Sequence, residues 1–301
     1  MPTLSQSILS KIMRLYPLYS GAIRIANHPM VQRFGGEKEE FVWASVKGGE
    51  VLCNLNDLVG RTAFYTGDLD SKVSWICEKI VRKGDTVLDI GANVGIVSLW
   101  LSRLVGETGR VHSFEPNPSL QRLITESIAR NNVTNVKLHP FGLGSKPDQM
   151  TLRILKENVG SGSLVLDYSA VDTDSITVNV ETLDSVIEKE CIKAIRFIKI
   201  DVEGFEGEVL KGARNVFQSI RPQAVLFEFA EPCEGTLGEQ PVFRFLQEAG
   251  YGFFSVPKCR LRMYLERCDP KVADPKASVD YLAVLRDADF ENIAKAIKAK
   301  L

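Results

Sequence analysis

The stretch that most constrains the fold runs from Val87 to Gly95, with the sequence VLDIGANVG, and leads into an apolar segment at 96–104. An apolar strand that passes through a glycine-rich turn into an apolar helix is typical of the first strand-helix unit of a cofactor-binding domain. The glycines allow the backbone to approach a ligand closely, and the free N–H groups of the new helix face the crevice beyond the strand. This unit predicts a nucleotide-cofactor site.

The spacing of the glycines indicates which cofactor this site takes. A dinucleotide fingerprint needs glycines in the pattern GxGxxG, but Asn93 and Ile96 occupy its second and third glycine positions. The pattern here is GxxxG, preceded by the acid Asp89. A carboxylate repels a pyrophosphate, but it suits the ammonium and sulfonium groups of S-adenosylmethionine. We therefore expect S-adenosylmethionine as the cofactor.

The second predicted strand supports this cofactor. It covers about residues 110–115 and ends in Glu115, twenty residues after Gly95. An acid at that distance can accept hydrogen bonds from both hydroxyls of a ribose.

The strand predicted at 195–201 carries the residues for the chemical step. Lys199 and Asp201 are two positions apart and share one face, with Asp201 at the carboxyl end. An alcohol that attacks a methyl group must lose its proton, so a carboxylate here can act as the base. Together with Glu228, at the end of the next strand, Asp201 could alternatively hold a divalent cation, Mg²⁺ or Mn²⁺. Both versions make Asp201 and Glu228 the catalytic candidates.

Four stretches in this order resemble the FkbM-type S-adenosylmethionine-dependent methyltransferases, over about residues 65–230: VLDIGANVGIVSL, VHSFEPNPSL, VETLDSVI and IKIDVEGFEGEVLKGA. The last of these is the most specific. The resemblance implies a Rossmann-like methyltransferase fold and methyl transfer to a hydroxyl oxygen of a sugar, a polyketide or another natural product. It does not specify the acceptor.

The expected cofactor contacts come from the ends of several strands. The glycine turn would meet the methionine part and the ribose, Asp89 would meet the ammonium directly or through water, and Phe114 to Pro116 would flank the ribose and adenine. The loop at 141–144 would form the opposite wall of the adenine slot. The cofactor-binding candidates are Tyr65, Asp89, Gly91, Ala92, Asn93, Gly95, Phe114, Glu115, Pro116, Gly142 and Asp201.

Alternating strand and helix patterns from residue 85 predict an α/β chain of the Rossmann-like class I methyltransferase fold, with a largely parallel seven-stranded sheet covered by helices on both faces. The strands are expected at 86–90, 110–115, 136–141, 195–201, 223–229, 251–256 and 281–286, and the helices at 95–105, 118–131, 205–217, 240–249 and 289–299. We place this domain at 73–301. Short antiparallel strands at 151–155, 163–166 and 176–180, with a Gly- and Ser-rich loop at 159–163, indicate a β insertion around 142–182 that could cover the cofactor cleft.

Residues 1–72 form an extension before this domain. Two strands at 41–46 and 50–55 read as a β-hairpin, and residues 1–36 contain four basic side chains and no acidic one. Leu4, Ile8, Ile12 and Leu15 recur at helical spacing, which predicts a basic amphipathic helix. We expect it to pack on the domain or on a second subunit of a homodimer; contact with a membrane surface or an anionic substrate is the alternative.

Composition excludes some function classes. The 37 Lys and Arg residues balance 38 Asp and Glu residues, unlike the strongly basic balance of a typical nucleic-acid-binding protein. The six cysteines show no zinc-site spacing, and the sequence has neither a signal-peptide pattern nor a membrane-spanning apolar run. A cytoplasmic protein, peripheral to a membrane if residues 1–36 bind one, is expected. A methyltransferase-like binding protein without catalysis and a nicotinamide-dependent oxidoreductase remain the alternative functions.

Overall fold

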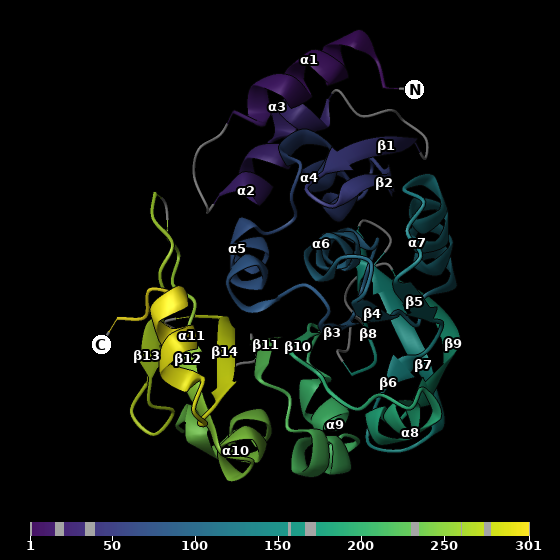
Figure 1. The fold of residues 1–301 in the computed structure, drawn as a ribbon. Coiled ribbons are helices and arrows are strands. Elements are labelled where there is room, and N and C mark those ends of the chain that lie inside the picture. The colour runs from purple at the N-terminus through teal and green to yellow at the C-terminus, as the bar shows by residue number, and fades with distance from the viewer. Residues whose placement is uncertain are drawn as a thin grey trace.

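The computed structural model describes residues 2–15, 21–33, 40–155, 158–165, 173–229, 235–259, 261–273 and 278–300 (Figure 1). Its helices are α1 (Leu4–Met13), α2 (Ala22–Ala26), α3 (Pro29–Gln32), α4 (Leu58–Thr66), α5 (Ser71–Ile80), α6 (Ile96–Val105), α7 (Pro118–Arg130), α8 (Leu183–Lys189), α9 (Glu206–Lys211), α10 (Pro241–Glu248) and α11 (Phe290–Ala296), with a π-helical turn η1 (Val216–Ile220) and a 3₁₀ turn η2 (Leu237–Glu239). Its strands are β1 (Phe41–Val46), β2 (Gly49–Asn54), β3 (Thr86–Ile90), β4 (Arg110–Phe114), β5 (Val136–His139), β6 (Gly142–Leu143), β7 (Asp148–Leu155), β8 (Asn158–Ser163), β9 (Thr173–Glu181), β10 (Phe197–Ile200), β11 (Ala224–Glu228), β12 (Tyr251–Ser255), β13 (Glu266–Cys268) and β14 (Asp280–Leu285).

The main sheet confirms the predicted α/β fold. Its strand order is β13-β12-β14-β11-β10-β3-β4-β5, and the five strands from β11 to β5 pair in parallel. β14 runs antiparallel to both of its neighbours. In the described chain the sheet has eight strands rather than the predicted seven, because β13 adds to the edge of β12. β13 has three residues and no apolar alternation, so no sequence pattern predicts it.

Side chains of alternate residues on each strand form two separate cores, one on each face of the sheet. On one face, Val87, Val111 and Phe197 pack with apolar residues of α5, α6 and α11. On the other, Leu88 and Ile198 pack with residues of α8, α9, η1 and α10. The expected cover of helices on both faces is therefore present.

The long helix expected at 205–217 is interrupted at Gly212. α9 ends at Lys211, and η1 begins at Val216. A β-carbon at Gly212 would lie 1.9 Å from the carbonyl oxygen of Gly144, so this position packs directly against the backbone that enters the insertion. Glycine at this helix end therefore also allows the close approach to Gly144.

The insertion forms a second sheet of order β6-β9-β7-β8 beside the main one (Figure 1). β7 and β9 are paired antiparallel along eight positions, from Asp148 with Val180 to Leu155 with Thr173. The Gly- and Ser-rich segment 159–163, predicted as a loop, instead lies in β8, so that prediction was wrong. Pairing with β7 overrides the low strand propensity of glycine and serine. Leu166, the last residue of the strand predicted at 163–166, lies outside the described residues.

The hairpin β1–β2 is present as expected and shares a core with the cofactor-binding unit. Val51 and Leu55 of the hairpin region are buried in one cluster with Leu99 of α6 and Leu123 of α7. The hairpin turn also fits closely on α6, because a β-carbon at Gly48 would lie 2.5 Å from the backbone carbon of Leu99. The packing is continuous between the hairpin region and the rest of the chain. The domain boundary expected at residue 72 therefore stays a prediction.

The orientation of the N-terminal helix differs from the expected one. α1 packs on α4 through Gln6, Ser10 and Met13, which are buried. Its apolar stripe of Leu4, Ile8, Ile12 and Leu15 is exposed instead. The helix does lie on the domain, but the prediction that the stripe would mediate this packing was wrong. Polar contacts, described below, decide which face is inward.

The close fit of the hairpin on α6 can be tested by adding one methyl group. Gly48→Ala should lower the free energy of unfolding by about 1–3 kcal/mol, because neither the hairpin nor the helix backbone can move away without loss of packing. Denaturant unfolding measures this change. Gly207→Ala in α9 is the matched control, since its β-carbon would lie 3.7 Å from the nearest atom, in ordinary contact. An equal effect in both variants would contradict the steric explanation.

Candidate active site

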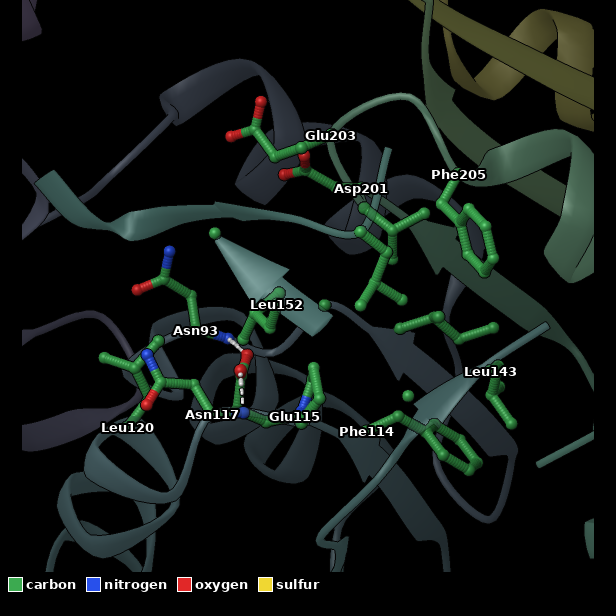
Figure 2. Close-up of a pocket in the computed structure, with 17 residues that line it drawn as sticks. Asn93, Phe114, Glu115, Asn117, Leu120, Leu143, Leu152, Asp201, Glu203 and Phe205 are labelled. Atoms are coloured by element: carbon green, nitrogen blue, oxygen red, sulfur yellow. Dashed lines mark hydrogen bonds between the residues drawn. The ribbon is translucent and has the colours of Figure 1, made fainter. Parts of the chain in front are cut away.

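A cavity opens at the carboxyl ends of β3, β4 and β10, where ligands bind in sheets of this kind. Figure 2 shows Asp201 and Glu203 on one side of it, and Glu115 with Asn93 and Asn117 on the other. The residues that line it are Ile90, Gly91, Asn93, Phe114, Glu115, Pro116, Asn117, Leu120, Gly142, Leu143, Leu152, Gly162, Leu164, Asp201, Val202, Glu203 and Phe205.

The glycine turn is held against the end of β10 by its backbone. Gly91 has a φ of +80°, and a β-carbon there would lie 1.9 Å from the carbonyl oxygen of Asp201. A side chain at position 91 would clash with the end of the neighbouring strand, so glycine is needed here even apart from any ligand. Gly95, with a φ of +85°, begins α6 and faces Ile124 of α7. These contacts place the cavity-lining Gly91 and Asn93 at the end of β3.

Glu115 connects the two loops at this edge of the sheet. Its Oε2 accepts the N–H of Asn93 at 2.9 Å, and its Oε1 accepts the N–H of Asn117 at 2.9 Å. Burial raises the pKa of Glu115 to about 7, although these two hydrogen bonds act in the opposite direction. A carboxylate oxygen can accept more than one hydrogen bond, so both oxygens keep capacity for ligand hydroxyls.

Asn117 is a site residue that the sequence reading did not identify. Its Oδ1 accepts the N–H of Ser119 and so caps α7, while its Nδ2 is buried without a hydrogen-bond partner in the structure. Asn117 lines the cavity, so Nδ2 is a donor available to a bound ligand. The stretch EPNP gave a signal for the cap, but nothing in it showed that the amide faces a cavity.

Apolar side chains from two sheets surround the rest of the cavity. Phe114 of β4 stacks on His139 of β5 with ring centroids 4.5 Å apart. Leu152 of β7 and Leu164, just after β8, come from the insertion, which therefore forms part of the cavity wall (Figure 2). The hydroxyl of Ser163 donates to the carbonyl oxygen of Glu203 at 2.9 Å and joins the insertion to the loop after β10.

A buried lysine connects the strands beneath the cavity. Nζ of Lys199 donates to the carbonyl oxygen of Gly91 at 2.9 Å and lies 3.2 Å from Asp201 Oδ2 and 3.7 Å from Asp89 Oδ1. Burial opposes its charge, but the Asp201 and Asp89 carboxylates outweigh this and raise the pKa of Lys199. Asp89, fully buried, also accepts a hydrogen bond from Ser98 of α6 at 2.6 Å.

Glu228 lies beside Asp201 on the next strand. Burial, followed by the neighbouring charge of Asp201, raises the pKa of Glu228 to about 8, and hydrogen bonding to Asp201 also favours its protonated form. Asp280 pairs with Glu228 in register across β14 and raises that pKa further. Glu228 is therefore protonated at neutral pH, and it can donate to Asp201 while Lys199 supplies the positive charge.

The structure brings most of the predicted site residues together. Gly91, Asn93, Phe114, Glu115, Pro116, Gly142 and Asp201 all line the cavity. Asp89 and Glu228 lie behind this lining, and neither Ala92 nor Gly95 contributes to it. Tyr65 does not lie there either: it is buried in the core that α4 shares with the hairpin. The role expected for Tyr65 at the cofactor stays a prediction.

A metal site would need more ligands than Asp201 and Glu228. Among the described residues, no group of three or more His, Cys, Asp or Glu side chains is arranged to hold a metal ion.

A parallel sheet of this strand order, with a glycine turn and an acid at the ends of its first two core strands, defines a Rossmann-like methyltransferase. Residues 89–253 match the Methyltransferase FkbM domain. The chain belongs to this family and is a methyltransferase.

Individual proteins of this class are similar to the chain. Hexuronic acid methyltransferase AglP of Haloferax volcanii is 28% identical over 218 residues, which cover 71% of this chain and 80% of that protein. The 31-O-demethyl-FK506 methyltransferase FkbM of Streptomyces tacrolimicus is 29% identical over 58% of this chain and 74% of its own length. A solved structure, Methyltransferase FkbM from Methylobacillus flagellatus KT, gives a TM-score of 0.40 at 15% identity, with 74% of this chain and 54% of that chain covered.

The proton on Glu228 makes a prediction about stability. Because its pKa is raised from 4.5 to about 8 in the folded protein, that proton is bound more tightly there than in the unfolded chain. The free energy of unfolding should therefore fall as the pH rises through this range. The side chain in Glu228→Gln cannot ionise, so the variant should not lose stability in this way. Relative to the variant, the wild type should lose on the order of 1 kcal/mol or more of its free energy of unfolding as the pH rises through this range.

Denaturant unfolding over the same pH range measures this difference. Glu208→Gln is the matched control, because side-chain hydrogen bonds from Lys211 and Ser145 lower the pKa of Glu208 and move its titration below the range. If the difference between wild type and Glu228→Gln does not change with pH, Glu228 does not carry the proton.

Proposed function

We propose that the chain is an S-adenosylmethionine-dependent O-methyltransferase that acts on a hydroxyl of a sugar, a glycan or another natural product. The observation that carries the proposal is the position of Asp201. Its carboxylate lines the cavity at the end of β10 and is held there by Lys199, on the side opposite Glu115. A base and a cofactor-binding acid on opposite sides of one cavity are what methyl transfer to an alcohol requires.

The hydrogen-bonding and apolar groups of the cavity suit this cofactor. Glu115 would accept the ribose hydroxyls, and the buried Nδ2 of Asn117 would donate to an acceptor on the nucleoside. Phe114, Leu143 and Phe205 supply apolar surface for a flat base. When bound, the cofactor supplies an electrophilic methyl group on a sulfonium. Asp89 would act through Lys199 and Ser98, by fixing β3 and α6, because it does not reach the cavity.

The catalytic role falls on Asp201 as general base. It would accept the proton of the acceptor hydroxyl as the oxygen forms its bond to the methyl carbon. Lys199 holds this carboxylate in position, and protonated Glu228 supplies a second hydrogen bond. A cation held by Asp201 and Glu228 is the competing version.

The acceptor class rests on the relatives. One is named for hexuronic acid and the other for 31-O-demethyl-FK506, a sugar acid and a natural product. We extend this class to the chain as the range of acceptors to test. A hydroxyl that enters beside Glu203 would meet Asp201 from the side opposite Glu115.

The assignment of Asn117 can be tested without removal of its helix cap. Asn117→Asp keeps an oxygen for the N–H of Ser119 but replaces the free Nδ2 donor by a carboxylate oxygen, so affinity for S-adenosylhomocysteine should fall by about tenfold or more. Isothermal titration calorimetry measures the affinity. Ser119→Ala, on the same turn but outside the cavity lining, should bind as wild type. Unchanged affinity in Asn117→Asp would refute the donor assignment.

The role of Asp201 is tested by Asp201→Asn, which keeps the size of the side chain but not its charge. The turnover number should fall by at least about a hundredfold, while the affinity for S-adenosylhomocysteine changes little. The assay follows a mass gain of one methyl group on free hexuronic acids and on hydroxylated macrolides. Glu208→Gln, an acid outside the cavity, should keep wild-type turnover.

The same assay distinguishes the two versions of the mechanism. Activity that persists with a chelator, and in Glu228→Gln, supports the general base, because a neutral amide can replace a protonated carboxyl but not a metal ligand. Activity that a chelator removes and Mg²⁺ restores supports the cation. Wild-type turnover in Asp201→Asn would refute both versions.

Two results would favour the alternative functions. Binding of NAD in place of S-adenosylhomocysteine would favour the oxidoreductase. Binding of S-adenosylhomocysteine without methyl transfer to any acceptor would favour the non-catalytic binding protein.

A further inference from the structure

The exposed stripe on α1 has the pattern of a contact surface. Leu4, Ile8, Ile12 and Leu15 are 78%, 50%, 59% and 79% exposed. Their spacing of four, four and three residues places them on one side of the helix. Lys11 belongs to the same side, three residues after Ile8 and four before Leu15. A row of four large apolar side chains in water is unfavourable unless something covers it.

Hydrogen bonds on the opposite side fix this orientation. The hydroxyl of Ser10 donates to the carbonyl oxygen of Phe64 at 2.8 Å, and Nη2 of Arg14 donates to the same oxygen at 2.9 Å. Nε2 of Gln6 donates to Glu40 Oε2 at 3.2 Å. Rotation of α1 that buried the apolar stripe would break these three bonds and leave polar groups unsatisfied. The stripe therefore stays outward as long as α1 remains docked on α4.

Charge indicates what covers the stripe. Lys11 lies on the exposed side of α1, and residues 1–36 contain two further basic residues, Arg24 and Arg33, besides the inward Arg14, and no Asp or Glu. In a two-fold dimer formed through this face, the basic segments of the two copies would lie against each other, which places like charges together. An anionic lipid surface complements both features, because it accepts apolar side chains at the acyl boundary and attracts Lys and Arg at the headgroups.

We propose that the outward face of α1, formed by Leu4, Ile8, Lys11, Ile12 and Leu15, docks the protein reversibly on an anionic membrane surface. In Figure 1, α1 lies at one end of the molecule with α2, α3 and the hairpin, away from α10 and α11. Docking there would leave the main sheet and the cavity outside the lipid. No helix among the described residues is long and apolar enough to span a bilayer. The contact is therefore a surface contact, independent of whether the enzyme transfers a methyl group.

Vesicle sedimentation with the full chain tests the proposal. The wild type should sediment with vesicles that contain about 30% phosphatidylserine, much less with pure phosphatidylcholine, and less at about 0.5 M than at about 0.1 M salt. Ile8→Ser with Ile12→Ser should reduce binding at least about tenfold. Both side chains are exposed, so the melting temperature should not change. Lys11→Glu should reduce binding to anionic vesicles alone.

A matched control removes equally exposed apolar groups elsewhere. Leu261→Ser with Val272→Ser, at residues 74% and 82% exposed in the C-terminal part of the chain, should bind vesicles as wild type does. Equal losses in both double variants would overturn the proposal, as would absence of binding by the wild type. Sedimentation equilibrium identifies the competing occupant: a wild-type dimer that Ile8→Ser with Ile12→Ser converts to a monomer, without a change in vesicle binding, would assign the face to a second copy.

Discussion

The arrangement of the site depends on one buried ammonium group. Lys199 lies between two acids from neighbouring parallel strands and also donates to the carbonyl oxygen of Gly91. A buried cation is stable only when it is paired, and a buried carboxylate likewise. Removal of Lys199 would leave Asp89 uncompensated under the glycine turn and Asp201 unsupported at the cavity. The glycine turn and the acid proposed as base therefore share one electrostatic partner.

The two acids beside this lysine have different surroundings. Asp201 faces Lys199 directly, whereas burial and the neighbouring acids Asp201 and Asp280 raise the pKa of Glu228. The sequence showed that Lys199 and Asp201 share a strand face, but it could not show that Lys199 also reaches β3.

Much of the fold was predictable because strands and helices in a parallel sheet have strong local patterns. The core strands and most helices lie within a few residues of their expected positions, and seven of the eleven proposed cofactor-binding residues line one cavity. The rest depends on tertiary contacts. Tyr65 is buried in a core that the distant hairpin completes, and Leu152 and Leu164 reach the cavity only because the insertion folds over it. The orientation of α1 likewise depends on a carbonyl group of α4, which no periodicity in α1 reveals.

The contact between Gly91 and the carbonyl oxygen of Asp201 has a consequence for the rate of the reaction. At a virtual β-carbon distance of 1.9 Å, the cofactor turn and the residue proposed as base touch through main-chain atoms. The separation of these two main-chain segments is therefore set when the protein folds. The Asp201 carboxylate proposed as base still depends on its side-chain rotamer, which the ion pair with Lys199 restricts. Binding must then align both the cofactor and the acceptor, and the loops around the cavity mouth are the elements placed to select the acceptor.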